Sequence, residues 1–296
     1  MAFEAALPLT SIIPYFIGFI VLFIGSYTDF KTREVPDWVN FGLIGIGFGI
    51  NLLFSAIYWK INFILASIAG FGIFFALAWL MFYFGQWGGG DSKMLMGLGA
   101  MIGIDIGFKA PQFLLGFFIN ALFVGAVYGL LWSVLLVFKH KEKFWKESAN
   151  MLSRKGVVAA KKMMLILLVL FFSMIFLIKP AYLKILIMSM AFLVLVTFYL
   201  WIFVKAVEKS AMHKLVEPSK LTEGDWIVKD VYVGKEYICG PKDLGIDKKQ
   251  IRKLIEFYKQ KKVKKILIKE GIPFVPSFFI AFFVTFVFGN PLFWLF

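Results

Sequence analysis

The sequence predicts an all-α integral membrane protein with about eight transmembrane helices and a small cytoplasmic α/β insert before the last helix. Apolar residues make up 60% of the 296 residues, charged residues only 17%, and the mean hydropathy is +0.83. Soluble domains usually carry about a quarter charged residues. Long runs with almost no charge recur along most of the chain, and such runs are typical of membrane helices.

Eight apolar runs approach or reach the length needed to cross a bilayer, and the fourth and sixth are the shortest. They cover residues 12–28, 39–57, 63–84, 94–108, 112–138, 163–178, 182–204 and 274–295. The runs divide the chain into a membrane core (1–138), a basic cytoplasmic loop (139–162), two further transmembrane helices (163–204), a soluble cytoplasmic insert (205–272) and a last transmembrane helix (273–296).

The polar segment 205–272 has the pattern of a small α/β insert. Residues 226–233 and 264–268 alternate or cluster β-branched and apolar side chains, as strands do. Between them, apolar residues recur at helical spacing from Asp247 to about Lys262. We therefore expect two strands and one helix in the insert.

The distribution of basic residues predicts the orientation of the chain in the cell membrane. If the N-terminus is outside, the inside segments hold 28 of the 32 Lys and Arg residues. Glu4 is the only charge before Asp29, so the first segment lacks a basic n-region and is expected to be a retained span. The net charge of +14 is then cytoplasmic charge that can contact membrane lipids, and nucleic acid is not needed to explain it.

The residues that usually hold metals are scarce. The chain has one cysteine, Cys239, and two histidines, His140 and His213, both in charged stretches. One cysteine excludes an intramolecular disulfide framework and a Cys-rich zinc site. We expect no metal.

Two aspartates are placed where they could act as a pair. Asp29 closes the first span and Asp91 opens the fourth, so both are expected at the cytoplasmic face. Two carboxylates held close share one proton, and such a pair can activate water and protonate a leaving amine. Structural interpretations are also open: Asp91 could be the N-cap of its helix, and Asp29 an interfacial charge.

Other polar residues near the spans have simpler interpretations. Asp37 follows Pro36 and is expected to cap the second span, Asp105 is expected to be structural or pore-lining near the outer face, and Lys93 fits a snorkelling anchor.

Glycines surround Asp91 and recur in two spans. Gly88, Gly89 and Gly90 would permit positive φ and close approach of an extended substrate. Small residues four apart let membrane helices pack closely. This spacing occurs at Gly99, Gly103 and Gly107 in the fourth span, and at Gly45 and Gly49 in the second.

Three segments resemble the type IV prepilin peptidases, a family that includes the archaeal preflagellin (archaellin) peptidases. Residues 88–100, Gly-Gly-Gly-Asp-Ser-Lys-Met-Leu-Met-Gly-Leu-Gly-Ala, are similar to the family's G-x-G-D-x-K-L segment. Residues 29–38, Asp-Phe-Lys-Thr-Arg-Glu-Val-Pro-Asp-Trp, resemble its first catalytic segment. Residues 272–278, Ile-Pro-Phe-Val-Pro-Ser-Phe, resemble its I-P-F-x-P entry to the last span.

The resemblance implies a membrane aspartyl protease of the GxGD type that needs no metal or cofactor. It implies Asp29 and Asp91 as the catalytic pair, and Gly88, Gly90 and Lys93 in the substrate-binding motif loop. The implied substrates are pilin-like or archaellin precursors, cut at the cytoplasmic side after a short basic leader. The Cys-rich loop of bacterial members is absent, which favours an archaeal type that acts only as a peptidase.

Two other functions fit parts of the pattern. An ion- or proton-coupled transporter would use Asp29, Asp91 and Asp105 as ion sites, but such sites lie near the bilayer midplane. A presenilin-like protease shares G-x-G-D, but its tyrosine-aspartate and Pro-Ala-Leu segments are missing.

Overall fold

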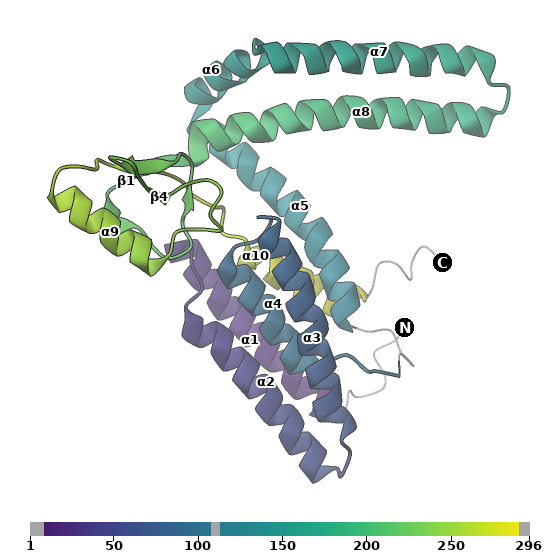
Figure 1. The fold of residues 1–296 in the computed structure, drawn as a ribbon. Helices are drawn as coiled ribbons and strands as arrows, with labels where there is room; N and C mark the ends of the chain where they lie inside the picture. The colour runs from purple at the N-terminus through teal and green to yellow at the C-terminus, as the bar shows by residue number, and fades with distance from the viewer. Residues whose placement is uncertain (1–8, 108–112, 290–296) are drawn as a thin grey trace. The chain divides into compact units, whose positions relative to one another are not determined.

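The computed structural model describes residues 9–107 and 113–289 and is mostly helical. Six of its helices are long and apolar enough to cross a membrane, and a small β-containing insert precedes the last helix (Figure 1). The predicted fold class, an all-α membrane protein with an insert, is confirmed. The chain forms two compact units, Met1–Leu131 with Gly271–Phe296, and Trp132–Glu270.

The first unit is a helical membrane core. Its helices are α1 (Leu9–Thr32), α2 (Asp37–Ile57), α3 (Asn62–Tyr83), α4 (Gly89–Ile102), the first part of α5 (Phe113–Lys139) and α10 (Val275–Phe288). Helices α4 and α10 have 14 residues each, or about 21 Å against a hydrocarbon core of about 30 Å. The sequence predicts about eight spans, whereas the described residues contain six helices that are long and apolar enough to cross a membrane.

Helix α4 ends inside the packed core instead of continuing to residue 108 as predicted. Its C-cap, Gly103, has φ +75°, which breaks the helical path. The carbonyl groups left free at this end accept hydrogen bonds from neighbouring helices: Asn51 Nδ2 donates to Ala100 and Met101, and the Ser67 hydroxyl donates to Ala100. A broken helix is tolerated at membrane depth when neighbouring side chains satisfy its backbone in this way.

Glycines bring α4 against α3 without intervening side chains. A Cβ atom added at Gly70 of α3 would lie 2.3 Å from the carbonyl oxygen of Gly99, and one at Gly99 would lie 2.6 Å from the oxygen of Gly70. A Cβ at Gly103 would lie 2.9 Å from the carbonyl carbon of Ala66. The small-residue packing predicted for Gly99 and Gly103 is present, whereas Gly107 lies beyond the end of the helix.

The contact between α2 and α4 uses a different glycine from the predicted pair. A Cβ at Gly47 would lie 2.7 Å from the backbone nitrogen of Met101, whereas nothing lies within 4 Å of a Cβ at Gly45 or Gly49. The prediction for Gly45 and Gly49 is wrong because spacing alone does not tell which face of a helix meets its neighbour.

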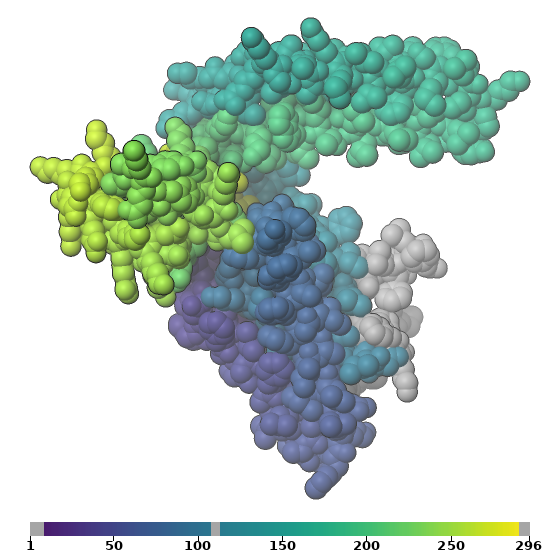
Figure 2. All heavy atoms as spheres, in the orientation of Figure 1, coloured from purple at the N-terminus to yellow at the C-terminus, as the bar shows by residue number. Residues whose placement is uncertain are grey.

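The second unit begins with the end of α5 and continues with α6 (Lys141–Leu152), α7 (Lys155–Leu177) and α8 (Ala181–Val207), which the insert follows. The segment 139–162 therefore differs from the expected loop in being mostly helical. Phe144 and Met151, two turns apart on α6, are buried against Ala206 and Val207, and this apolar face explains the helix. Helices α7 and α8 lie side by side (Figure 1, Figure 2) and expose most of their apolar side chains, as lipid-facing helices do.

The insert contains more strands than expected. Strands β1 (His213–Val216), β5 (Ile266–Lys269) and β2 (Trp226–Ile227) form an antiparallel sheet in the order β1-β5-β2, and β3 (Val231–Val233) pairs with β4 (Glu236–Cys239). The single strand predicted for residues 226–233 is thus two short strands in different sheets. Helix α9 (Lys248–Lys259) lies within the segment predicted to be helical, from Asp247 to about Lys262, and Asp247 is its N-cap.

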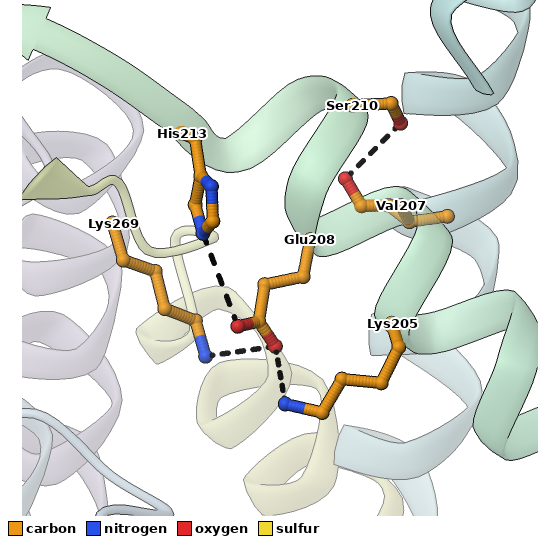
Figure 3. Close-up of polar contacts among 6 residues, drawn as sticks. All are labelled: Lys205, Val207, Glu208, Ser210, His213 and Lys269. Carbon is orange, nitrogen blue, oxygen red and sulfur yellow. Dashed lines mark hydrogen bonds and ion pairs between the residues drawn. The ribbon is translucent and has the colours of Figure 1, made fainter. Parts of the chain in front are cut away.

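A polar cluster joins the end of α8 to the insert (Figure 3). Glu208 begins a short π-helix, Glu208–Met212, and its carboxylate lies 3.0 Å from Lys205 Nζ and 3.4 Å from Lys269 Nζ of β5. His213 Nε2 lies 4.0 Å from the same carboxylate. Burial lowers the pKa of His213, which favours the neutral ring at pH 7, so the charged partners of Glu208 are the two lysines.

Candidate active site

Asp29 lies in the last turn of α1 and ties that helix to the start of α10. Its side chain is buried, with only 5% of the residue exposed. Its Oδ2 atom accepts a hydrogen bond of 2.9 Å from the backbone N–H of Val275, the first residue of α10. The N–H groups of a first helical turn have no partner within the helix, so the carboxylate satisfies one of them. A simple interfacial charge would not be held in this way.

Asp91 is the third residue of α4 and is partly buried. Its Oδ2 atom accepts a hydrogen bond of 2.9 Å from the backbone N–H of Gly88, the N-cap residue. Asp91 is therefore not the N-cap itself, but its carboxylate closes the same helix end from the third position. Each aspartate uses one oxygen to hold a helix start, and a carboxylate can accept about four hydrogen bonds, so each retains capacity for a substrate or water.

The helices that carry the two aspartates, α1 and α4, pack against each other. Gly25 lies one turn before Asp29, and Met94 nearly one turn after Asp91. A Cβ at Gly25 would lie 2.7 Å from the Met94 Cε atom and 3.3 Å from a methyl group of Val275. The missing side chain at Gly25 thus lets α1, α4 and α10 meet just beside the two aspartates.

The glycines before Asp91 do not have the conformation that was predicted. Positive φ occurs at Gly85 (+64°), but not at Gly88, Gly89 or Gly90. The last two already belong to α4, where the helix fixes their backbone. Gly88 instead leaves room for the Asp91 side chain, because a Cβ at residue 88 would lie 3.2 Å from Oδ2 of Asp91. A Cβ at Gly90 would lie 3.6 Å from Val35, an ordinary van der Waals distance.

Gly88→Ala is expected to lower the cleavage rate proposed below, whereas Gly89→Ala should leave it nearly unchanged. The added methyl group at residue 88 must push the Asp91 carboxylate by a few tenths of an ångström, while a Cβ at residue 89 meets only a ring atom at 4.0 Å. A displacement of 1 Å can cost a hundredfold, so we expect a loss of up to about tenfold. Leader release by the two purified variants checks this, and equal rates would contradict it.

The remaining polar residues of the motifs have local partners. Lys93 Nζ forms an ion pair with Asp37 at the start of α2 and lies 5.2 Å from the ring centre of Phe41. Asp37 is thus the first residue of its helix and pairs with Lys93, whereas the N-cap position belongs to Pro36. Asp105 is exposed and its carboxylate accepts a hydrogen bond from the N–H of Gly107, a local turn contact.

One contributor to the site is not predicted from the sequence. It is the backbone N–H of Val275. The motif 272–278 marks its segment, but nothing in the sequence links it to Asp29. Among the described residues, no group of three or more His, Cys, Asp or Glu side chains could hold a metal ion.

A known protein family matches the part of the chain that contains both aspartates. Residues 16–130 match the sequence model of the type IV leader peptidase family. The chain thus resembles that family over this segment, which is less than half of its length. The leader-peptidase segment (residues 16–130) contains Asp29 and Asp91, whereas Val275 lies outside it.

Three curated relatives have similar segments, and each is named a preflagellin peptidase. The relative from Methanococcus maripaludis is 41% identical over 92 residues, which are 30% of this chain and 39% of the relative. Those from Methanocaldococcus jannaschii and Methanococcus voltae are each 40% identical over 90 residues, 30% of this chain and 38% of the relative. The matched segment thus spans about two fifths of the length of these relatives.

Proposed function

We propose that the chain is a membrane aspartyl endopeptidase that removes the short basic leader from archaellin or type IV pilin-like precursors. The observation that carries the proposal is the packing of α1, α4 and α10 beside Asp29 and Asp91, two aspartates at helix ends inside the leader-peptidase segment. The names of the relatives favour archaellin precursors as substrates.

The chemistry follows from two carboxyl groups that share one proton. The ionised carboxylate takes a proton from a water molecule as the water attacks the scissile peptide carbonyl. The protonated carboxyl donates a hydrogen bond to the carbonyl oxygen and later protonates the leaving amine. The two groups titrate as a pair, so the roles of base and acid belong to the pair and not to one residue.

The surrounding residues hold this pair in place. The N–H groups of Val275 and Gly88 each fix one carboxylate oxygen. Gly88 and Gly90 keep the start of α4 free of side chains. We propose that this helix start, with Gly88, Gly90 and Lys93, binds the substrate next to the cleavage site, as the resemblance implies.

The proposed location is the cytoplasmic face of the cell membrane, with the N-terminus outside. Asp29 lies three residues before the end of α1 and Asp91 two residues after the start of α4, so both carboxyls belong to helix ends. The Lys and Arg distribution of the loops supports the cytoplasm as the side of these ends. The location of both aspartates at helix ends also argues against a transporter, because transport sites lie near the bilayer midplane.

Leader release by purified protein in detergent tests the proposal. The substrates are an archaellin precursor and a pilin precursor, each with a basic leader, a glycine and a hydrophobic stretch. We expect cleavage of at least one precursor, unaffected by a metal chelator. If folded wild-type protein leaves both precursors intact, the protease proposal fails, and Asp-dependent ion flux into liposomes becomes the measurement for the transporter alternative.

A further inference from the structure

Residues 139–162 form a basic segment whose charge is not balanced within the protein. The segment holds eight Lys and Arg residues against two glutamates, a formal excess of six positive charges. All eight basic residues are exposed: Lys139, Lys141, Lys143, Lys146, Arg154, Lys155, Lys161 and Lys162. Among the residues that the structure describes, none of the eight forms an ion pair, although Glu142 and Lys146 have the four-residue spacing that permits one in a helix.

Several lysines at the end of α8 and in the insert do have acidic partners. Lys205 and Lys269 share the carboxylate of Glu208 (Figure 3). Four more lysines of the insert each lie within 3.6 Å of a glutamate oxygen: Lys214, Lys248, Lys253 and Lys265. The insert thus balances part of its basic charge internally, whereas the basic segment balances none of its own.

The basic segment lies at the membrane surface because of its place in the chain. It begins at the last residue of α5, contains α6 and ends within the first part of α7 (Figure 1). Both α5 and α7 are long and apolar enough to cross a membrane, so the segment joins two spans on one side of the bilayer. Trp145 of α6 is 61% exposed. Lysines and tryptophans at the ends of spans are typical of the headgroup region.

We propose that the basic segment binds anionic phospholipid headgroups of the leaflet that it faces. The lipid phosphates supply the negative charge that the protein lacks there, and Trp145 lies among the headgroups. The proposed peptidase substrate does not fit this surface, because its leader is itself basic. Lipid binding by the segment goes beyond the proposed function and does not depend on it.

Two triple variants of the full chain test the inference. The α6 variant changes three lysines without an acidic partner: Lys141→Gln, Lys143→Gln and Lys146→Gln. The insert variant, its matched control, changes three lysines that have one: Lys248→Gln, Lys253→Gln and Lys265→Gln. Both remove three positive charges from exposed residues of the second unit, so the two variants have the same net charge. Both should unfold like the wild type, because glutamine suits a helix as well as lysine does and exposed ion pairs contribute little.

The measurement is the Kd of added lipid for the detergent-purified protein, obtained by native mass spectrometry. The probes are phosphatidylglycerol, which carries one negative charge, and neutral phosphatidylcholine. We expect the first phosphatidylglycerol molecule to bind the wild type more tightly than phosphatidylcholine does. Its Kd should rise at least about fivefold in the α6 variant, the effect of losing about one lysine near an anionic headgroup. The insert variant should keep the wild-type Kd.

The salt dependence of the wild type provides a second test that needs no variant. Raising ammonium acetate from about 0.1 M to about 1 M shortens the screening length from about 10 Å to about 3 Å, which should weaken binding of phosphatidylglycerol but not of phosphatidylcholine. Equal Kd values for the two lipids would overturn the inference, and so would an equal rise in both triple variants. Displacement of the lipid by an equal concentration of ammonium phosphate would show that the segment binds free phosphate and would also overturn it. None of these outcomes depends on cleavage, so they leave the peptidase proposal to the leader-release assay.

Discussion

Asp29→Asn and Asp91→Asn are each expected to lower the rate of leader cleavage about a thousandfold or more, the scale of general acid–base catalysis. Asparagine keeps the shape of the side chain but cannot exchange a proton with water. Its amide oxygen can still accept the hydrogen bond from Val275 or Gly88 that each carboxylate receives now. The variants therefore remove the chemistry and keep the helix ends in place.

Two matched changes serve as controls in the same assay. Asp37→Asn weakens an exposed ion pair with Lys93, a contact worth less than about 1 kcal/mol. Asp105→Asn alters an exposed turn. Both variants should keep most of the activity, and all four should insert and unfold like the wild type. Substantial cleavage by either Asp29→Asn or Asp91→Asn would exclude that residue from the catalytic pair.

Gly70→Ala is expected to destabilise the membrane core and to reduce cleavage strongly, although Gly70 lies far along the chain from either aspartate. The added methyl carbon would lie 2.3 Å from the carbonyl oxygen of Gly99, so α3 and α4 must separate. Overpacking of this kind costs about 1 to 3 kcal/mol. Separation also moves α4, the helix that carries Asp91.

Gly72→Ala, two residues further along α3, is the matched control. Nothing lies within 4 Å of a Cβ at this position. Alanine is the better helix former by about 0.5 to 1 kcal/mol, so this variant should be as stable as the wild type or slightly more stable. Thermal unfolding in detergent and leader release, measured on both variants, check the prediction. Equal stability of the two variants would show that the α3–α4 contact can relax.

The sequence predicts the site better than it predicts the packing around it. Asp29 and Asp91 stand out because carboxylates are rare and costly near membrane spans and because short motifs surround them. By contrast, the apolar runs do not reveal which helix faces meet, so the four-residue spacing predicts contacts at Gly45 and Gly49, whereas Gly47 makes the contact with α4. The end of α4 depends on hydrogen bonds from Asn51 and Ser67 on two other helices, and no local pattern shows those bonds.

The charged segment after α5 illustrates a second limit. Its many lysines suggested a loop, but two apolar residues, Phe144 and Met151, suffice to pack α6 on the end of α8. The hydrogen bond between Asp29 and Val275 illustrates a third limit of prediction from sequence. Val275 contributes a backbone N–H, a group that every residue except proline carries, so residue identity cannot reveal the contact.

The hydrogen bond between Asp29 and Val275 also sets the order in which the site can be completed during synthesis. The two residues are 246 positions apart, which corresponds to about 12 to 50 s of translation at about 5 to 20 residues per second. Once residue 130 has been added, the leader-peptidase segment is complete, but the N–H group that fixes Asp29 has not yet been made. The nascent chain thus acquires its complete arrangement only once α10 has been made, so a ribosome-bound protein lacking that helix would hold both aspartates without the contact that orients one of them.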